Sequence, residues 1–361
     1  MVTSDNVIQQ LGKVIDPELR RPITELNMVD NVAVNDDHVD VRVLLTTPAC
    51  PLGGTLESAV TEALLALDGV ESVSVSLGAM DDAQRETLRK QLRGGEEPGN
   101  PFTDPDSPTR VLAVASGKGG VGKSTISANL ATELARRGYR VGLVDADIYG
   151  FSIPRMMGIT QQPVAIDSMI VPPIGHGVKT ISIGMFIQDN APVMWRGPML
   201  HRAIQQFFSD VFWDDLDFLL LDLPPGTGDV AMSVAQLIPR SEILVVTTPQ
   251  ASAAAVAERA GSLGGQTGQR VVGVVENMSY MVMPDGTHSA IFGTGGGARV
   301  AKALSTDLGY RVPLLGEVPL EAPIGESSDA GTPYVLRTEA SPARDMLRSI
   351  ADGLETPKVR A

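Results

Sequence analysis

The architecture of this chain follows from one segment, Gly117-Lys118-Gly119-Gly120-Val121-Gly122-Lys123-Ser124-Thr125. The apolar run at 111–115 before it is typical of a buried strand, and 125–137 after it carries apolar residues at helical spacing. A strand, a glycine-rich loop and a helix in this order form a phosphate-binding loop, in which backbone N–H groups and the helix N-terminus converge on an anion. A simple glycine turn beside a surface lysine would not need these flanking elements. We therefore predict that residues 117–125 bind a nucleoside triphosphate.

Three side chains of this loop have expected roles. Lys123 would reach the β- and γ-phosphates, and the Ser124 hydroxyl would ligate Mg²⁺. Lys118 stands too early in the loop to reach the γ-phosphate of its own nucleotide. It would instead cross a dimer interface to the nucleotide of the partner chain and act there as an arginine finger does. Hydrolysis would then require a homodimer.

Acidic residues follow two of the later strands. Asp145 and Asp147 come at the end of the strand predicted at 140–144, and Asp222 ends the strand predicted at 217–222. Parallel sheets bind ligands at the carboxyl ends of their strands. We expect Asp222 to hold a water of Mg²⁺, which is the Walker B role, and Asp147 to position the attacking water. Asp145 would either share in this site or cap a helix.

Composition limits the class of protein. The chain has 361 residues, of which 43% are hydrophobic and only 4% aromatic, so we expect a large aliphatic core. Its net charge of −14 disfavours nucleic acid as the main partner. The first ten residues lack the order of a signal peptide, and no apolar run reaches the roughly 20 residues of a membrane helix. We therefore expect a cytoplasmic protein that does not act at a membrane.

Two domains are predicted. The stretch 94–109 is rich in proline and glycine and reads as a linker. Residues 1–93 before it combine period-2 runs with helical patterns, which indicates a small α/β domain. In 110–361 strands alternate with helices, as in a P-loop NTPase domain built on a mostly parallel sheet. Its strands are predicted at 111–115, 140–144, 179–183, 217–222, 242–247, 271–275 and 313–316. A helix at 344–354 is expected to pack on the core rather than on a membrane.

The segment 118–124 resembles the deviant Walker A motif of the ParA, MinD and nitrogenase iron-protein superfamily. Further strings resemble the Mrp/ApbC family of iron–sulfur cluster carrier ATPases: Asp145-Ala-Asp-Ile-Tyr-Gly150, Ile153-Pro-Arg-Met-Met-Gly158, Trp195-Arg-Gly-Pro198, Asp222-Leu-Pro-Pro-Gly-Thr-Gly-Asp229, Glu276-Asn-Met-Ser279 and Ile291-Phe-Gly-Thr-Gly-Gly296. The resemblance covers nearly all of 110–335. It implies ATP as the nucleotide and places Asn277 near the adenine, with the 318–320 loop beside it.

The first domain resembles a small module of iron–sulfur assembly factors that also occurs fused in front of Mrp proteins. The strings that carry this resemblance are Asp16-Pro-Glu18 and Thr46-Thr-Pro-Ala-Cys50-Pro51. Client apo-proteins or other iron–sulfur assembly proteins are the partners that it implies.

The chain departs from the Mrp pattern at one place. These carriers typically hold a cluster with a Cys-x-x-Cys pair after the Glu-Asn-Met-Ser string, and here the two positions fall at about Met283 and Gly286. A thioether and a glycine cannot replace two thiolates on iron. Cys50, the only cysteine, and more distantly His288 remain as ligands, so a cluster is possible but its usual ligands are absent. Cys50 could equally be a buried small side chain or a thiolate favoured by a helix N-terminus.

Two functions remain open. The first is an ATP-hydrolysing, homodimeric iron–sulfur carrier or assembly protein of the Mrp type. The alternative is a cluster-free scaffold or dimerisation switch that uses ATP as ParA and MinD do. The acidic charge argues against a ParA role, and no basic amphipathic tail supports a MinD role.

Overall fold

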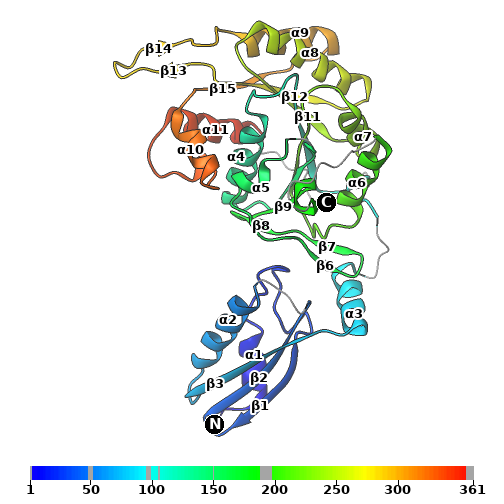
Figure 1. Cartoon of the computed structure of the whole chain (residues 1–361), viewed down its shortest axis with the longest axis vertical. Coiled ribbons are helices and arrows are strands. Elements are labelled where there is room, and N and C mark those ends of the chain that lie inside the picture. The colour runs from blue at the N-terminus through cyan, green and yellow to red at the C-terminus, as the bar shows by residue number, and fades with distance from the viewer. Residues whose placement is uncertain are drawn as a thin grey trace. The chain divides into compact units, whose positions relative to one another are not determined.

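The computed structural model describes residues 2–47, 52–94, 99–104, 106–148, 150–187 and 197–354 (Figure 1). The chain divides into two compact units. One comprises Met1–Pro98 together with the short segments Pro163–Pro172 and Asp210–Phe212, and the other comprises the remaining residues. None of the described helices is both long enough and apolar enough to cross a membrane.

The first unit is a three-stranded sheet with helices. The sheet order is β1-β2-β3, in which β1 and β2 are antiparallel and β2 and β3 are parallel. Its elements are α1 (Ser4–Leu11), β1 (Val29–Asn35), β2 (His38–Leu45), α2 (Gly53–Leu65), β3 (Ser72–Ala79) and α3 (Asp82–Leu92). An α/β character was predicted for this part, and the strand β1 was not.

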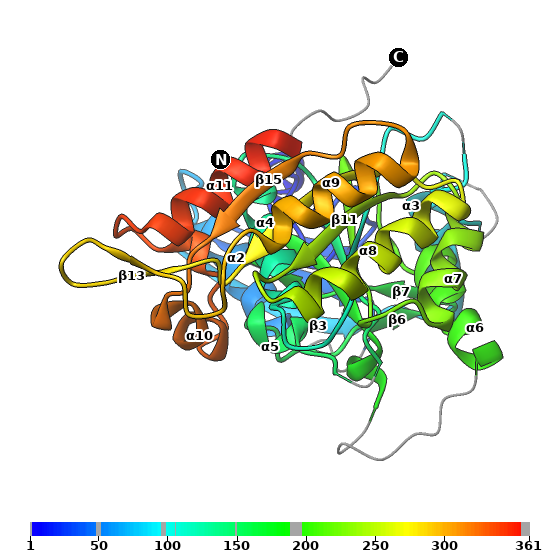
Figure 2. The ribbon, with the colours of Figure 1, turned by 90° about the horizontal axis from the view of Figure 1, so that it is seen from above.

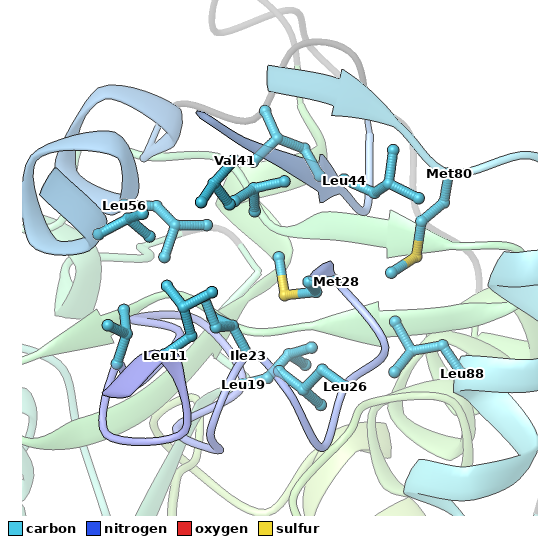
Figure 3. Packing of buried hydrophobic residues seen from close by; sticks show 14 of the residues in the cluster. Leu11, Leu19, Ile23, Leu26, Met28, Val41, Leu44, Leu56, Met80 and Leu88 are labelled. Carbon is cyan, nitrogen blue, oxygen red and sulfur yellow. The ribbon is translucent and has the colours of Figure 1, made fainter. Parts of the chain in front are cut away.

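The core of the first unit is aliphatic. Leu11 from α1, Leu56 from α2 and Val41 from β2 converge on Ile23 and Met28 of the connecting segment, as Figure 3 shows. The short strands β6 (Val164–Ile166) and β7 (Met169–Val171) form a hairpin that adds apolar side chains to the same core. Two segments that follow the linker in the sequence, Pro163–Pro172 and Asp210–Phe212, thus help to bury the apolar side chains of the first unit.

The second unit is built on an eight-stranded sheet of order β15-β12-β11-β4-β10-β5-β9-β8. All neighbouring pairs are parallel except β8 and β9. Its strands are β4 (Arg110–Ser116), β5 (Val141–Asp145), β8 (Ile174–Gly175), β9 (Val178–Ser182), β10 (Phe218–Asp222), β11 (Glu242–Thr247), β12 (Val271–Asn277) and β15 (Leu314–Val318). This confirms the predicted mostly parallel sheet, and all seven predicted strands are present.

Helices cover both faces of this sheet. The longer ones are α4 (Lys123–Arg136), α6 (Gly197–Ser209), α7 (Asp229–Leu237), α8 (Ala251–Gln266), α9 (Gly296–Leu308) and α11 (Pro342–Leu354). The strand β15 contacts α11 and α9 and lies between them in Figure 2. Two short helices, α5 (Ile153–Met156) and α10 (Ala322–Asp329), and a hairpin of β13 (Met281–Val282) and β14 (His288–Ser289) complete the unit. The C-terminal helix α11 packs on α4 and β15, as a core helix should.

Candidate active site

The glycine loop connects the end of β4 to the start of α4, at the carboxyl edge of the sheet. Gly120 and Gly122 have φ angles of 78° and 82°, which side chains with a Cβ rarely adopt. Gly117 needs to be glycine for another reason, because a Cβ there would overlap the backbone of Val256 and Ala257 in α8. The loop therefore curls tightly, with its backbone packed against a neighbouring helix.

The structure brings Lys123, Ser124 and Asp222 together, while their roles toward phosphate and Mg²⁺ stay predictions. The ammonium of Lys123 lies 2.8 Å from a carboxylate oxygen of Asp222, and both side chains are buried. The Ser124 hydroxyl donates to the same oxygen of Asp222 at 2.6 Å. Asp222 is the last residue of the central strand β10, which pairs with β4. The contact of Asp222 with Lys123 and Ser124 therefore follows from the order of the strands in the sheet.

A cavity of about 740 Å³ opens in front of this group. Its volume lies in the range typical of small-molecule sites. The loop residues Lys118–Thr125 line one side of it, and Asp147, Gly150 and Ser152 line another. Further lining residues come from the segment after β10, from the start of α7 and from α6. The phosphate loop and the predicted water-positioning carboxylate therefore face one space.

Asp145 lies behind this cavity rather than in its wall. Its side chain is fully buried at the end of β5, opposite Asp222 in the strand register. Burial and the negative charge of Asp222 raise the pKa of Asp145 to about 7. The carboxylate accepts hydrogen bonds from the backbone N–H groups of Ser152 and Ile153, where α5 begins. The helix-capping role considered for Asp145 is therefore present in the structure.

Lys118 is engaged within its own chain. Its ammonium donates to the side-chain oxygen of Gln250 at 2.7 Å and lies 3.4 Å from the Ser252 hydroxyl. Gln250 immediately precedes α8 and Ser252 lies in its first turn, a few residues after the end of β11. The action of Lys118 on a partner chain stays a prediction, and in that action the lysine would have to leave Gln250.

Asn277 contacts the phosphate loop itself. Its side-chain amide donates to the carbonyl of Val121 at 2.9 Å, and Asn277 is not among the residues that line the cavity. The neighbouring Glu276 is buried and accepts hydrogen bonds from Ser279 and from the backbone N–H of Gly297 at the start of α9. The expected contact of Asn277 with adenine stays a prediction, while its observed role is to brace the glycine loop.

The described residues offer no ready metal cluster site. No group of three or more histidine, cysteine, aspartate or glutamate side chains that could hold a metal ion occurs among them. Met283 and Gly286 lie at the exposed turn between β13 and β14, and the ring of His288 stacks on Tyr280 at 4.1 Å. Cys50 lies outside the described residues, as do Trp195 and Arg196.

Several residues of the site are not among those predicted from the sequence. Ser127, one helical turn after Ser124, donates to the second oxygen of Asp222 at 2.7 Å. Its spacing from Ser124 on the same face of α4 is a signal that could have identified it. Gln250 and Ser252 carry no such signal, because only the tertiary fold brings them to Lys118.

Comparison with known proteins agrees with this geometry. Residues 107–355 match a family described as the NUBPL iron-transfer P-loop NTPase, of ParA type, and residues 4–93 match a family described as iron–sulfur cluster assembly protein. A Mycobacterium tuberculosis protein named iron–sulfur cluster carrier protein is 60% identical over 96% of this chain and 91% of its own length.

Solved structures resemble this chain over about two thirds of its length. A nucleotide-binding protein from Archaeoglobus fulgidus, solved in complex with ADP, is 35% identical and aligns with a TM-score of 0.53 over 62% of this chain and 87% of its own. MinD from Pyrococcus horikoshii, at 21% identity and a TM-score of 0.50, covers 68% of this chain and 96% of its own and shares the fold.

Proposed function

The chain belongs to the family of NUBPL iron-transfer P-loop NTPases, and from this premise we propose that it is an ATP-hydrolysing carrier of iron–sulfur clusters that acts as a homodimer. One observation carries the nucleotide part of this proposal. The cavity is lined by a glycine loop with positive φ angles, and Asp147 faces the same space. Such a site can bind a triphosphate and orient a water molecule toward it.

Mg²⁺ fits the side chains at the base of the loop. The Ser124 hydroxyl and an Asp222 oxygen lie 2.6 Å apart, and oxygen donors of this kind are the ligands that Mg²⁺ prefers. Ser124 would bind the ion directly and Asp222 through a water. When bound, the ion neutralises charge on the β- and γ-phosphates. The protein's own part is to hold Ser124 and Asp222 together, with Ser127 as a second donor to Asp222.

The phosphates and the attacking water would be handled by three side chains. Lys123 would pair with the β- and γ-phosphates, and Asp147 would accept a hydrogen bond from the water and so fix its direction. Lys118 of the second chain would stabilise the charge that spreads over the γ-phosphoryl oxygens. Because Gln250 holds Lys118 within the monomer, dimer formation would exchange one hydrogen-bond partner for a phosphate.

The iron–sulfur cluster would be cargo. Among the described residues no group of three or more histidine, cysteine, aspartate or glutamate side chains could hold the cluster, so we propose that Cys50 of each chain supplies the thiolates and that a client protein completes the set. Anaerobic reconstitution with iron and sulfide tests this, read by visible absorbance on wild type and Cys50→Ser in parallel. Wild type should gain absorbance and the variant should not.

A second candidate function also starts from the finding that no group of cluster-binding side chains occurs among the described residues. In it the protein is a cluster-free switch that dimerises on ATP and positions partner proteins. Reconstitution would then leave both proteins colourless, while ATP-dependent self-association would persist. Equal absorbance in wild type and Cys50→Ser would contradict the role of Cys50.

A further inference from the structure

One carboxylate anchors both ends of the loop that carries Asp147. This loop follows β5 and spans 146–152, with residue 149 outside the described residues. One oxygen of Asp145 accepts from the backbone N–H of Asp147 at 3.2 Å. The other oxygen accepts from the N–H groups of Ser152 at 3.1 Å and Ile153 at 3.2 Å. The entry and the exit of the loop thus converge on a single side chain.

A fourth hydrogen bond ties this carboxylate to the neighbouring strand. The Ser182 hydroxyl, at the end of β9, donates to Asp145 at 3.1 Å and itself accepts from the N–H of Gly184 at 3.2 Å. Asp145 and Ser182 are fully buried and are paired in the strand register. A buried carboxylate with this many donors has a fixed orientation, because every alternative leaves polar groups unsatisfied.

The same hydrogen bonds hold Asp147 in place within the loop. The Asp147 backbone is fixed by Asp145, and its carboxylate accepts from the N–H of Gly150 at 3.0 Å inside the same loop. Asp147, Gly150 and Ser152 line the cavity, whereas Asp145 does not. Asp145 therefore has no surface from which to touch a ligand, but its hydrogen bonds fix the backbone of two cavity-lining residues, Asp147 and Ser152.

We propose that Asp145 is a positioning residue for ATP hydrolysis, which holds Asp147 at the cavity wall in the orientation needed to direct the attacking water. This inference rests on the proposed function, since it assigns Asp145 a role in the reaction attributed to Asp147. It predicts an effect on turnover with little effect on nucleotide affinity. A purely structural role would instead change stability and leave the turnover of the folded protein intact.

The test uses the full-length protein with Asp145→Asn, Asp147→Asn and the double variant. Asparagine keeps the shape of Asp145 but has one acceptor oxygen, so with either orientation of the amide at least one of the four donors faces an NH2 group and loses its acceptor. We expect kcat to fall by about 10- to 100-fold, the range that a small misplacement of a reacting group produces. The dissociation constant of Mg·ATP should change less than about threefold, because no atom of Asp145 lines the cavity.

The double variant separates positioning from structure. If Asp145 acts through Asp147, adding Asp145→Asn to Asp147→Asn should lower the residual hydrolysis by less than about twofold, since coupled residues are not additive. Equal losses in both backgrounds would overturn the inference, as would normal turnover in Asp145→Asn. If the Asp147→Asn variant itself hydrolyses ATP normally, the role proposed for Asp147 is wrong. That result can be told apart from a failure of the role proposed for Asp145, which the Asp145→Asn variant tests.

Ser182→Ala provides a milder variant should Asp145→Asn not fold. It removes one of the four donors and leaves the three backbone hydrogen bonds in place. We expect a fall in kcat of about two- to fivefold, in keeping with the loss of a single hydrogen bond to a charged group that acts indirectly. The fall should vanish in the Asp147→Asn background. Unchanged turnover in Ser182→Ala would contradict the inference.

Discussion

Lys123 and Asp222 form a buried ion pair at the base of the phosphate loop, and single side chains around it have separable tasks. Lys123 lies 2.8 Å from Asp222, while Lys118 of the same loop points to Gln250. The two lysines stand only five positions apart in the sequence, yet they face different partners. Substitution at each should therefore change a different quantity: binding for Lys123 and turnover for Lys118.

The Lys118→Ala variant should bind Mg·ATP as wild type does but should hydrolyse it far more slowly. The ammonium of Lys118 is bound to Gln250 and Ser252, whereas that of Lys123 is paired with Asp222, so we expect the dissociation constant of Mg·ATP to stay within about threefold. Turnover should fall at least about 100-fold, as when a charge-stabilising finger is removed. A steady-state phosphate-release assay checks this, with the exposed Lys302→Ala as the control. Undiminished turnover would rule out the action of Lys118 on a partner chain.

At the level of elements, the contact of β4, the glycine loop and α8 constrains Gly117 but not Gly119. A Cβ at Gly117 would overlap the backbone of α8, whereas at Gly119 its nearest neighbour would be a ring atom of Pro225 at 3.9 Å. We expect Gly117→Ala to lower the free energy of unfolding by about 1–3 kcal/mol, as overpacking does. Gly119→Ala should unfold like wild type. Urea titrations followed by circular dichroism compare the two, and equal stability would contradict the packing argument.

The helices α4 and α11 are joined by a charged group centred on Glu133. This buried glutamate accepts from Arg136 at 2.8 and 2.7 Å and from Arg137 at 2.9 Å, and Arg348 of α11 lies 3.6 Å away. Burial acts to raise the pKa of Glu133, but the hydrogen bonds from Arg136 and Arg137 outweigh it and hold the pKa below its ordinary value of 4.5.

Glu133→Gln should therefore destabilise the protein in a pH-dependent way. At pH 7 we expect the free energy of unfolding to fall by about 1–3 kcal/mol, because partly exposed arginines lose their partner. The native pKa lies below the unfolded one, so the charge stabilises the fold above pH 4.5 and its contribution is lost as pH falls through the native value. The variant and wild type should thus converge in acid, while exposed Glu326→Gln should match wild type throughout. A difference that persists in acid would contradict this.

The same elements show what sequence can and cannot predict. Strands such as 218–221 and 243–246 are unbroken apolar runs, so their burial on both faces of a parallel sheet was predictable. The strand β1 was missed because Asp30, Asn31 and Asn35 interrupt its apolar pattern and it is only half-buried. The hydrogen bonds of Asp145 with Ser182, and of Lys118 with Gln250, join strands and helices that are distant in sequence. Local periodicity carries no information about such pairs.

At the scale of the whole molecule, the roles given to Lys118 and Cys50 both require a second chain. We expect the protein to sediment as a monomer without nucleotide. The Asp147→Asn variant, in which ATP hydrolysis is impaired, should sediment as a dimer in the presence of Mg·ATP. Binding a ligand that completes a site between two chains shifts the equilibrium toward the assembly. Analytical ultracentrifugation measures this, with Mg·ADP as the control. A monomer under all three conditions would leave Lys118 without a partner nucleotide.

Every role proposed for this protein in ATP hydrolysis requires that the glycine loop at 117–125 binds a triphosphate. Calorimetric titration of Mg·ATP into the folded protein tests this most directly, with Lys123→Ala and Lys302→Ala in parallel. Wild type and Lys302→Ala should bind one nucleotide per chain, and Lys123→Ala should bind at least about tenfold more weakly, because a charge-assisted contact contributes about 1.5–3 kcal/mol. Absence of binding heat in folded wild type across several temperatures, or equal affinity in Lys123→Ala, would contradict the account.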